Sequence, residues 1–469
     1  MTAESAAPSR FRTQLHPRQI KSHLDQFLIG QDRAKVVVSV AVFNHYQRVQ
    51  VFDDRKERLQ REFETRLRND LAASEAAASG HAVEHERLSF QEHADASTDV
   101  SKLHKSNVLL LGPTGSGKTL MMQTVAKFVG VPFTIVDCTS LTQAGYVGED
   151  VDICIRRLLE NSDYDVQKAE FGIVVLDECD KLAKPMRSGP FFSKDVAGEG
   201  VQQSLLQMIE GADITVKKSN APAGLTSRET FTVNTENILF IFSGAFVGLE
   251  KIITERLKRK GSFESFGFRS NKQGLEEQTD IKNFFTPSNT HPLNLLENED
   301  LVAFGLIPEL VGRIPNVSPL LPLTEQDMAR IITEPKNAIL RQYQQSFKMF
   351  GVELKFTDRA IGWLAKMALK QGTGARGLKG VMARLLLDVN YELPESSTKY
   401  VLITEDVVKT FKMINDDEKV KPFYYSRGQR LKFLDHLASE RLQHEIKPNL
   451  IEEPVVVEEL VKKRVRSVN

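Results

Sequence analysis

The chain has 469 residues, of which 41% are hydrophobic and 26% charged, and its 62 lysines and arginines balance 62 aspartates and glutamates. This length allows two or three domains with ample apolar core. A net charge of zero gives no global basic field, so we expect no nucleic-acid partner. No run approaches the ~20 apolar residues that cross a bilayer, so we expect no membrane insertion.

The N-terminal part of the chain predicts a basic start, a helix and an insertion. Residues 1–19 hold three arginines and one acid. This basic, acid-poor composition resembles a mitochondrial transit segment, and a disordered start explains it equally well. A turn at Ile29 and Gly30 leads into a helix with one apolar face. Residues 53–105 are charged and then rich in alanine and serine, which predicts a charged helical insertion with a loop.

Residues 112–119 form a complete phosphate loop, GxxxxGK[ST], directly after the apolar run 108–111. The glycines let backbone N–H groups turn toward phosphate oxygens, Lys118 reaches the β and γ phosphates, and the Thr119 hydroxyl ligates Mg²⁺. A strand before the loop and a helix after it are the context that the motif requires. The loop therefore predicts a nucleoside triphosphate held by Gly112, Pro113, Thr114, Gly115, Ser116, Gly117, Lys118, Thr119 and Leu120.

A second strand, predicted at 173–176, ends in Asp177 and Glu178. In a parallel sheet both carboxylates emerge at the carboxyl edge, where such sheets place their ligands. Asp177 suits the Mg²⁺ shell, and Glu178 is placed to polarise the attacking water. Alone, an acidic pair after a strand is more often a solvated strand end. Downstream of a phosphate loop it predicts a hydrolase.

Apolar runs alternate with helical stretches across the middle of the chain, at 108–111, 133–136, 173–176 and 238–242. The alternation predicts an α/β fold, with a parallel sheet covered by helices on both faces in an αβα arrangement. Two apolar helical stripes beyond residue 320 predict a separate, small and mainly helical domain. The predicted divisions are an N-terminal segment 1–19, a large domain 20–320, a small domain 321–415 and a charged extension 416–469.

The three cysteines, Cys138, Cys154 and Cys179, form no CxxC pair and have no histidine nearby. We therefore expect no zinc and no disulfide framework, and a reducing compartment fits best.

The phosphate loop, the acidic pair, Gly312-Arg313 and the stretch 374–377 together resemble an AAA+ ATPase. Three further stretches are similar to the protein-unfolding ring ClpX, at 142–151, 198–206 and 304–315. The resemblance implies a homohexameric ring that hydrolyses ATP with Mg²⁺, threads protein clients through its pore and has no peptidase activity of its own. The absent zinc-binding domain and the helical insertion resemble fungal mitochondrial members, which implies the mitochondrial matrix; a bacterial member would be cytoplasmic.

The resemblance also implies roles around the nucleotide. Arg313 reaches the nucleotide of the neighbouring subunit, where a guanidinium stabilises the charge on the γ-phosphoryl oxygens during hydrolysis. Arg376 touches the nucleotide of its own subunit, so the angle between the domains would follow nucleotide state. Ile29 and Gly30 pack against the adenine, and Ser243 senses the γ-phosphate.

Two loops carry the implied contacts with other proteins. Tyr146, followed by Val147, grips the client in the pore, because an aromatic ring between glycines swings freely and presents apolar surface without sequence-specific demands. Phe266, Gly267 and Phe268 stand where relatives carry an aliphatic-Gly-Phe triplet that docks onto the ClpP peptidase. The aromatic first position leaves a working and a degenerated docking loop equally plausible. Some fungal members act without a peptidase and remodel clients that include a haem-biosynthesis enzyme.

Two other classes of function share some of these features. An ATP-driven nucleic-acid motor also has a phosphate loop and a ring, but it needs basic pore residues and a basic surface, whereas this chain has an aromatic pore turn and no net charge. A nucleotide-dependent assembly scaffold would bind its clients without translocating them.

Overall fold

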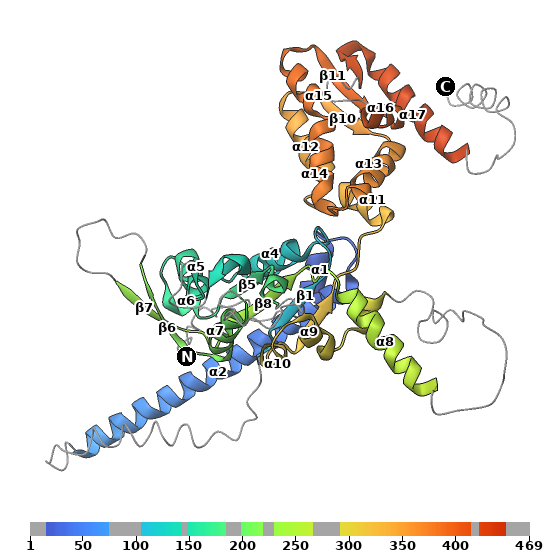
Figure 1. The fold of residues 1–469 in the computed structure, drawn as a ribbon. Coiled ribbons are helices and arrows are strands. Elements are labelled where there is room, and N and C mark those ends of the chain that lie inside the picture. Colours follow the sequence, from blue (N-terminus) through green and yellow to red (C-terminus); the bar gives the residue numbers. More distant parts are fainter. Residues whose placement is uncertain are drawn as a thin grey trace, which may run out of the picture. The chain divides into compact units, whose positions relative to one another are not determined.

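The computed structural model describes residues 16–74, 105–142, 149–183, 198–218, 229–265, 291–413 and 422–446 (Figure 1). Contacts divide the chain into two compact units. The first comprises Met1–Lys21, Arg33–Leu111 and Val125–Pro319, and the second comprises Ser22–Asp32, Gly112–Thr124 and Leu320–Asn469. The phosphate loop therefore groups with the C-terminal part of the chain and not with the strand that precedes it.

A five-stranded parallel sheet in the order β2-β5-β8-β1-β9 organises the first unit. Every residue of β1 and β8 is buried, as expected for central strands covered on both faces. The predicted α/β class and the four predicted strands are confirmed. The edge strand β9 has no apolar run, so the hydrophobic pattern does not reveal it. The strands are β1 (Val108–Leu111), β2 (Phe133–Asp137), β5 (Ile173–Asp177), β8 (Leu239–Gly244) and β9 (Asn316–Pro319).

Helices of the first unit pack their apolar faces into one core with this sheet. Leu158 and Leu205, both fully buried, join the cluster that includes Leu176 of β5 and Phe240 of β8. The packed helices are α5 (Ile153–Asn161), α6 (Val166–Ala169), α7 (Glu199–Glu210), α8 (Leu249–Ser265), α9 (Asn298–Phe304) and α10 (Pro308–Gly312). Two small pairs complete the unit: β3 (Leu141–Thr142) with β4 (Glu149–Asp150), and the hairpin β6 (Asp213–Lys217) with β7 (Thr230–Asn234).

The predicted turn and N-terminal helix are present. Helix α1 (Pro17–Asp25) is followed by a turn in which Gly30 (φ 67°) and Gln31 (φ 58°) adopt left-handed conformations. Helix α2 (Asp32–Ser74) then runs without a break, so the charged residues after position 53 extend the same helix. Among the described residues no helix is both long and apolar enough to cross a bilayer.

The second unit contains the predicted small domain, which is mainly helical. The two predicted apolar stripes are confirmed, with fully buried Leu364 and Ala368 on one helix and Leu378 and Val381 on the next. Its helices are α11 (Glu325–Thr333), α12 (Ile339–Met349), α13 (Asp358–Lys370), α14 (Ala375–Leu385), α15 (Leu387–Glu392), α16 (Glu405–Met413) and α17 (Arg430–Ile446). A sheet of β10 (Glu353–Phe356), β11 (Thr398–Ile403) and β12 (Phe423–Ser426), which the sequence does not predict, packs with them.

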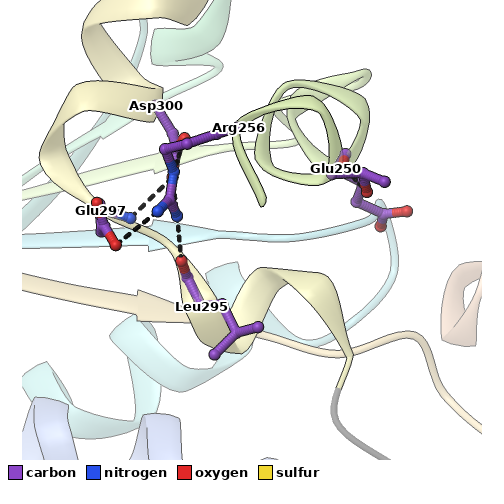
Figure 2. A network of polar contacts seen from close by, with 6 residues as sticks. Glu250, Arg256, Leu295, Glu297 and Asp300 are labelled. Carbon is purple, nitrogen blue, oxygen red and sulfur yellow. Dashed lines mark hydrogen bonds and ion pairs between the residues drawn. The ribbon is translucent and has the colours of Figure 1, made fainter. Parts of the chain in front are cut away.

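A polar network fixes α8 to its neighbours in the first unit (Figure 2). Arg256 of α8 donates from Nε and Nη2 to Asp300 of α9, at 2.7 and 3.0 Å, and from Nη2 to the carbonyl of Leu295 at 2.6 Å. Glu297 pairs with the same guanidinium. Asp300 is only 1% exposed, so its carboxylate depends on this arginine for its compensating charge.

Candidate nucleotide site

The phosphate loop has the backbone that its glycines predict. Gly112, Gly115 and Gly117 have φ values of 149°, 75° and 100°, which side chains other than hydrogen disfavour. Lys118 begins helix α4 (Lys118–Val129), so the amino end of a helix dipole follows the loop. The Lys118 ammonium donates to the Gly112 and Pro113 carbonyls at 2.6 and 3.0 Å, which holds its charge within the loop.

The Ser116 hydroxyl of the loop lacks a hydrogen-bond partner within the part of the chain that the structure describes. Ser116 is 5% exposed, and its Oγ has no partner among the described residues. A buried hydroxyl without a partner is costly, so its presence in the loop suits a polar ligand such as a phosphate oxygen.

The amino end of α14 lies against the phosphate loop. The Ala375 N–H donates to the Gly115 carbonyl at 3.1 Å. A Cβ on Gly115 would lie 2.4 Å from the Thr373 carbonyl oxygen, and one on Gly374 would lie 2.7 Å from that of Thr114. Because Arg376 is the second residue of α14, this contact brings the helix that carries the predicted arginine onto the loop.

The turn with Ile29 and Gly30 belongs to the same unit and also borders the loop. A Cβ on Gly117 would lie 3.3 Å from Leu28 Cδ2. Gln31 fixes the turn, since its amide nitrogen donates to the Leu321 carbonyl at 2.8 Å and its amide oxygen accepts from the Leu321 N–H at 2.9 Å. The sequence places Gln31 in the predicted turn but does not reveal its hydrogen bonds to Leu321, and Leu28 was not singled out because it belongs to no motif.

In the first unit the sheet register aligns the ends of β5, β8 and β1. Leu176 pairs with Phe242, and Leu110 pairs with Ser243, so Asp177, Ser243 and the last residues of β1 end at the same edge. Ser243 is fully buried, and its Oγ has no partner among the described residues. The sequence predicts that Mg²⁺ binding and the activation of water take place at this carboxyl edge.

Glu178 has an unusual backbone directly after β5. Its φ of 55° is left-handed, which is uncommon for a residue other than glycine, and its N–H donates to Asp177 Oδ1 at 3.0 Å. Its side chain is exposed. Such strained positions concentrate at functional sites, so the conformation agrees with a residue oriented for chemistry.

Asp180 is a further residue of this edge that sequence reasoning missed. It lies in the short helix η2 (Cys179–Leu182), is 7% exposed, and accepts a hydrogen bond from the Ala245 N–H at 3.1 Å. The contact ties the segment after Glu178 to the end of β8. A lone acid two positions after a motif gives no signal in the sequence.

Arg313 follows α10 in the first unit and is half exposed. Its guanidinium pairs with Glu210 at 2.7 Å, with the side chains 55% and 46% exposed. Its carbonyl accepts a hydrogen bond from Asn107 Nδ2 at 3.0 Å. The arginine is therefore on the surface of its own subunit, which a residue acting on a neighbour's nucleotide requires.

Some predicted positions lie outside the described residues, namely Tyr146 and Val147 and the candidate docking triplet Phe266, Gly267 and Phe268. The three cysteines are buried and form no disulfide with one another. Within the described ranges no group of three or more histidine, cysteine and acidic side chains is arranged to hold a metal ion.

Comparisons with known proteins agree with this arrangement. A model of the AAA domain (Cdc48 subfamily) matches residues 103–317, and a model of the C-terminal D2-small domain of ClpB protein matches residues 323–398. The chain is 42% identical over 471 residues to a protein of Saccharomyces cerevisiae described as an ATP-dependent clpX-like chaperone, mitochondrial; the match covers 92% of this chain and 89% of that protein.

These matches confirm the predicted class of function, an ATP-hydrolysing unfoldase or chaperone, and the predicted mitochondrial location. The two family models follow one another along the chain as a nucleotide-binding domain and a small domain do in an AAA+ module. With its phosphate loop, acidic strand end and near full-length similarity, the chain belongs to the ClpX-like chaperones of the AAA+ ATPases.

Proposed function

We propose that six copies of this chain form a ring that unfolds mitochondrial proteins by drawing them past Tyr146. The observation that carries the proposal is the backbone contact between Gly115 of the phosphate loop and Ala375 of α14. Because of this contact, a movement of the phosphate loop when the bound phosphates change would displace the helix that carries Arg376. A mechanical cycle needs such a link between nucleotide state and the small domain.

Each residue of the site has a distinct role in hydrolysis. Lys118 and the N–H groups of the loop bind the phosphates, and the Thr119 hydroxyl and the Asp177 carboxylate supply the hard oxygen ligands that Mg²⁺ prefers. When bound, Mg²⁺ neutralises charge on the β and γ phosphates. Glu178 orients and polarises the attacking water. Arg376 contacts the nucleotide of its own subunit, and Arg313 that of its neighbour.

The hydrolytic assignment is tested by Glu178→Gln. The variant keeps the size of the side chain but removes the charge that polarises water, so ATP binding should persist while turnover falls at least 100-fold, within the range of general-base effects. Binding is measured by titration with ATP and turnover by phosphate release. The matched control is Glu160→Gln on α5, which should hydrolyse ATP at the normal rate. Unchanged hydrolysis in Glu178→Gln would overturn the role of Glu178.

The threading assignment is tested by Tyr146→Ala. A ring that pulls on a client should keep its ATPase but lose unfolding of a tagged folded reporter, because alanine offers little surface to grip. A nucleotide-dependent scaffold would keep its effect on clients. Reporter unfolding that persists in the variant would refute the role of Tyr146 in gripping the client.

The partners can be identified by trapping them on a ring that binds ATP but does not hydrolyse it. Glu178→Gln with ATP should hold clients in the pore, and their recovery from a mitochondrial extract tests whether a haem-biosynthesis enzyme is among them. A ClpP-type peptidase that uses Phe266, Gly267 and Phe268 should be recovered in the same experiment. Its loss when Phe268→Ala is used would support docking through the triplet, and unchanged recovery would refute it.

A further inference from the structure

Helix α7 holds both ends of the short helix α10 that precedes Arg313. At the amino end of α10, the Ile307 N–H donates to the side-chain oxygen of Gln202 at 2.9 Å. At the carboxyl end, the Arg313 guanidinium pairs with Glu210 at 2.7 Å. Both partners belong to α7, the first near its start and the second at its last residue.

The same glutamine reaches the segment that follows the catalytic carboxylates. Gln202 Nε2 donates to the Leu182 carbonyl at 2.8 Å. Leu182 ends η2, which begins directly after Glu178. Gln202 is fully buried, and both polar atoms of its amide have partners, so its rotamer is fixed by the two segments that it joins.

The backbone of Arg313 has an independent anchor. Asn107, which is 1% exposed, donates to the Arg313 carbonyl and accepts at Oδ1 from the Phe240 N–H of β8 at 3.4 Å. The backbone at Arg313 is therefore fixed relative to the sheet. What can still change is the conformation of the long Arg313 side chain. Glu210 is the residue seen to restrict it.

We propose that Gln202 and Glu210 are positioning residues for Arg313, and that α7 links the strand end bearing Asp177 and Glu178 in one subunit to the arginine that serves the next subunit. The inference rests on the proposed role of Arg313 in the neighbour's site. A half-exposed ion pair adds little to the stability of the fold. We therefore assign Glu210 the role of orienting the Arg313 guanidinium.

Steady-state ATPase measurements give the first test. Glu210→Gln should lower kcat about tenfold and change KM less than about twofold, since a displaced arginine loses transition-state contacts while the phosphate loop is intact. Glu210→Asp should recover part of the loss. Glu334→Gln is the matched control, because Glu334 pairs with Arg330 at 2.9 Å with side chains 47% and 53% exposed. Unchanged kcat in Glu210→Gln would overturn the proposal.

Gln202→Leu tests the other end of α10. It should lower kcat to a similar extent, and Gln203→Ala, at the exposed neighbouring position of α7, should not. Should Gln202→Leu fail to fold, as judged by thermal unfolding, Glu210→Gln still decides the question because its side chain is at the surface.

Mixed rings separate positioning from a structural role. Glu210→Gln subunits are combined with an excess of Glu178→Gln subunits, which do not hydrolyse ATP themselves but supply an intact Glu210 and Arg313 to their neighbours. Hydrolysis per Glu210→Gln subunit should rise severalfold. Arg313→Ala subunits, mixed in the same way, are the reference for a defect located in the neighbour's site.

The pattern of rescue distinguishes the two hypotheses. Rescue of Arg313→Ala without rescue of Glu210→Gln would refute the role of Glu210 and leave the proposed function intact. Failure to rescue Arg313→Ala would refute the action of Arg313 on the neighbouring site, and with it this inference.

Discussion

The phosphate loop and the segment around Arg313 are held in place by opposite means. At the loop, Gly115 and Gly374 bring two backbones so close that a Cβ on either would overlap a carbonyl oxygen. Around Arg313, the side chains of Gln202, Glu210 and Asn107 span wider gaps with hydrogen bonds and an ion pair. The first region depends on the absence of side chains, and the second depends on their presence.

This difference bears on how each region responds to change. A backbone contact without room for a methyl group transmits small shifts directly but fails when any atom is added. Side chains that bridge elements can be replaced by shorter or uncharged ones with graded loss. We therefore expect abrupt failure at the loop contact and graded effects where side chains hold the framework.

The expected abrupt failure of the contact between the phosphate loop and α14 is tested by Gly374→Ala, for which we expect the largest loss of ATP hydrolysis. Gly374 has φ 57° and ψ −145°, a region nearly restricted to glycine, and its new Cβ would lie 2.7 Å from the Thr114 carbonyl oxygen. The loop or α14 must shift, so ATP hydrolysis should fall to background. Phosphate release measures the loss, and nucleotide titration shows whether binding is lost too.

Gly380→Ala provides the matched control within the same helix. A Cβ at Gly380 would meet no atom within 4 Å, and alanine favours a helix over glycine by about 1 kcal/mol. This variant should hydrolyse ATP normally and melt at a slightly higher temperature. Normal hydrolysis in Gly374→Ala would show that the loop contact tolerates a side chain, which removes the contrast between the two regions.

The expectation of graded effects where side chains bridge elements is tested most strongly in the network around Arg256 (Figure 2). Arg256→Met keeps the aliphatic stem but leaves the buried Asp300 carboxylate without its cation. The hydrogen bonds to Asp300 hold the pKa of Arg256 above its ordinary value, so the charge is present at neutral pH. Breaking a buried ion pair costs about 3–5 kcal/mol, which denaturant unfolding should detect.

Arg330→Met is the surface counterpart of that change. Arg330 bonds Glu334 with the same pair of atoms, at 2.9 and 3.0 Å, but both side chains are about half exposed. The expected loss is below about 0.5 kcal/mol. Equal losses in the two variants would mean that burial does not determine the strength of these side-chain bridges.

Much of the site could be predicted because its signals are local in the chain. The phosphate loop and Asp177 with Glu178 each occupy a few consecutive residues next to an apolar run. The bridges could not be predicted, because Gln202 and Ile307 are separated by 105 positions and Asn107 and Arg313 by 206. No local pattern records such a contact.

The missed elements have a related cause. Strands β9 and β10 are four residues each and lie at the edges of their sheets, so neither carries the long apolar run that marks a central strand. The second of the two apolar stripes predicted beyond residue 320 is shared between two helices, because the chain leaves α14 at Leu386 before α15 begins.

A third kind of support is a buried neutral imidazole on α2, for which we expect a smaller effect than for the Arg256 network. His45 is fully buried, and its Nε2 lies 3.1 Å from the Asn237 carbonyl. Burial, and then the nearby positive charges of Arg48 and Lys105, lower the pKa of His45 from 6.5 to about 3. Between these values the unfolded chain binds more protons than the folded one, so stability falls as the pH decreases from 6.5 toward 3.

His45→Gln measures this contribution, because glutamine can keep a hydrogen bond to the Asn237 carbonyl but does not titrate. At pH 5 the native protein should lose about 2 kcal/mol of stability through His45 relative to pH 7.5, since each pH unit below 6.5 is worth about 1.4 kcal/mol. Denaturant unfolding of both proteins at the two pH values gives the comparison. If the variant shows the same pH dependence as the native protein, His45 is not the titrating group; if its dependence is reduced by about that amount, the imidazole supports the fold only while it is neutral.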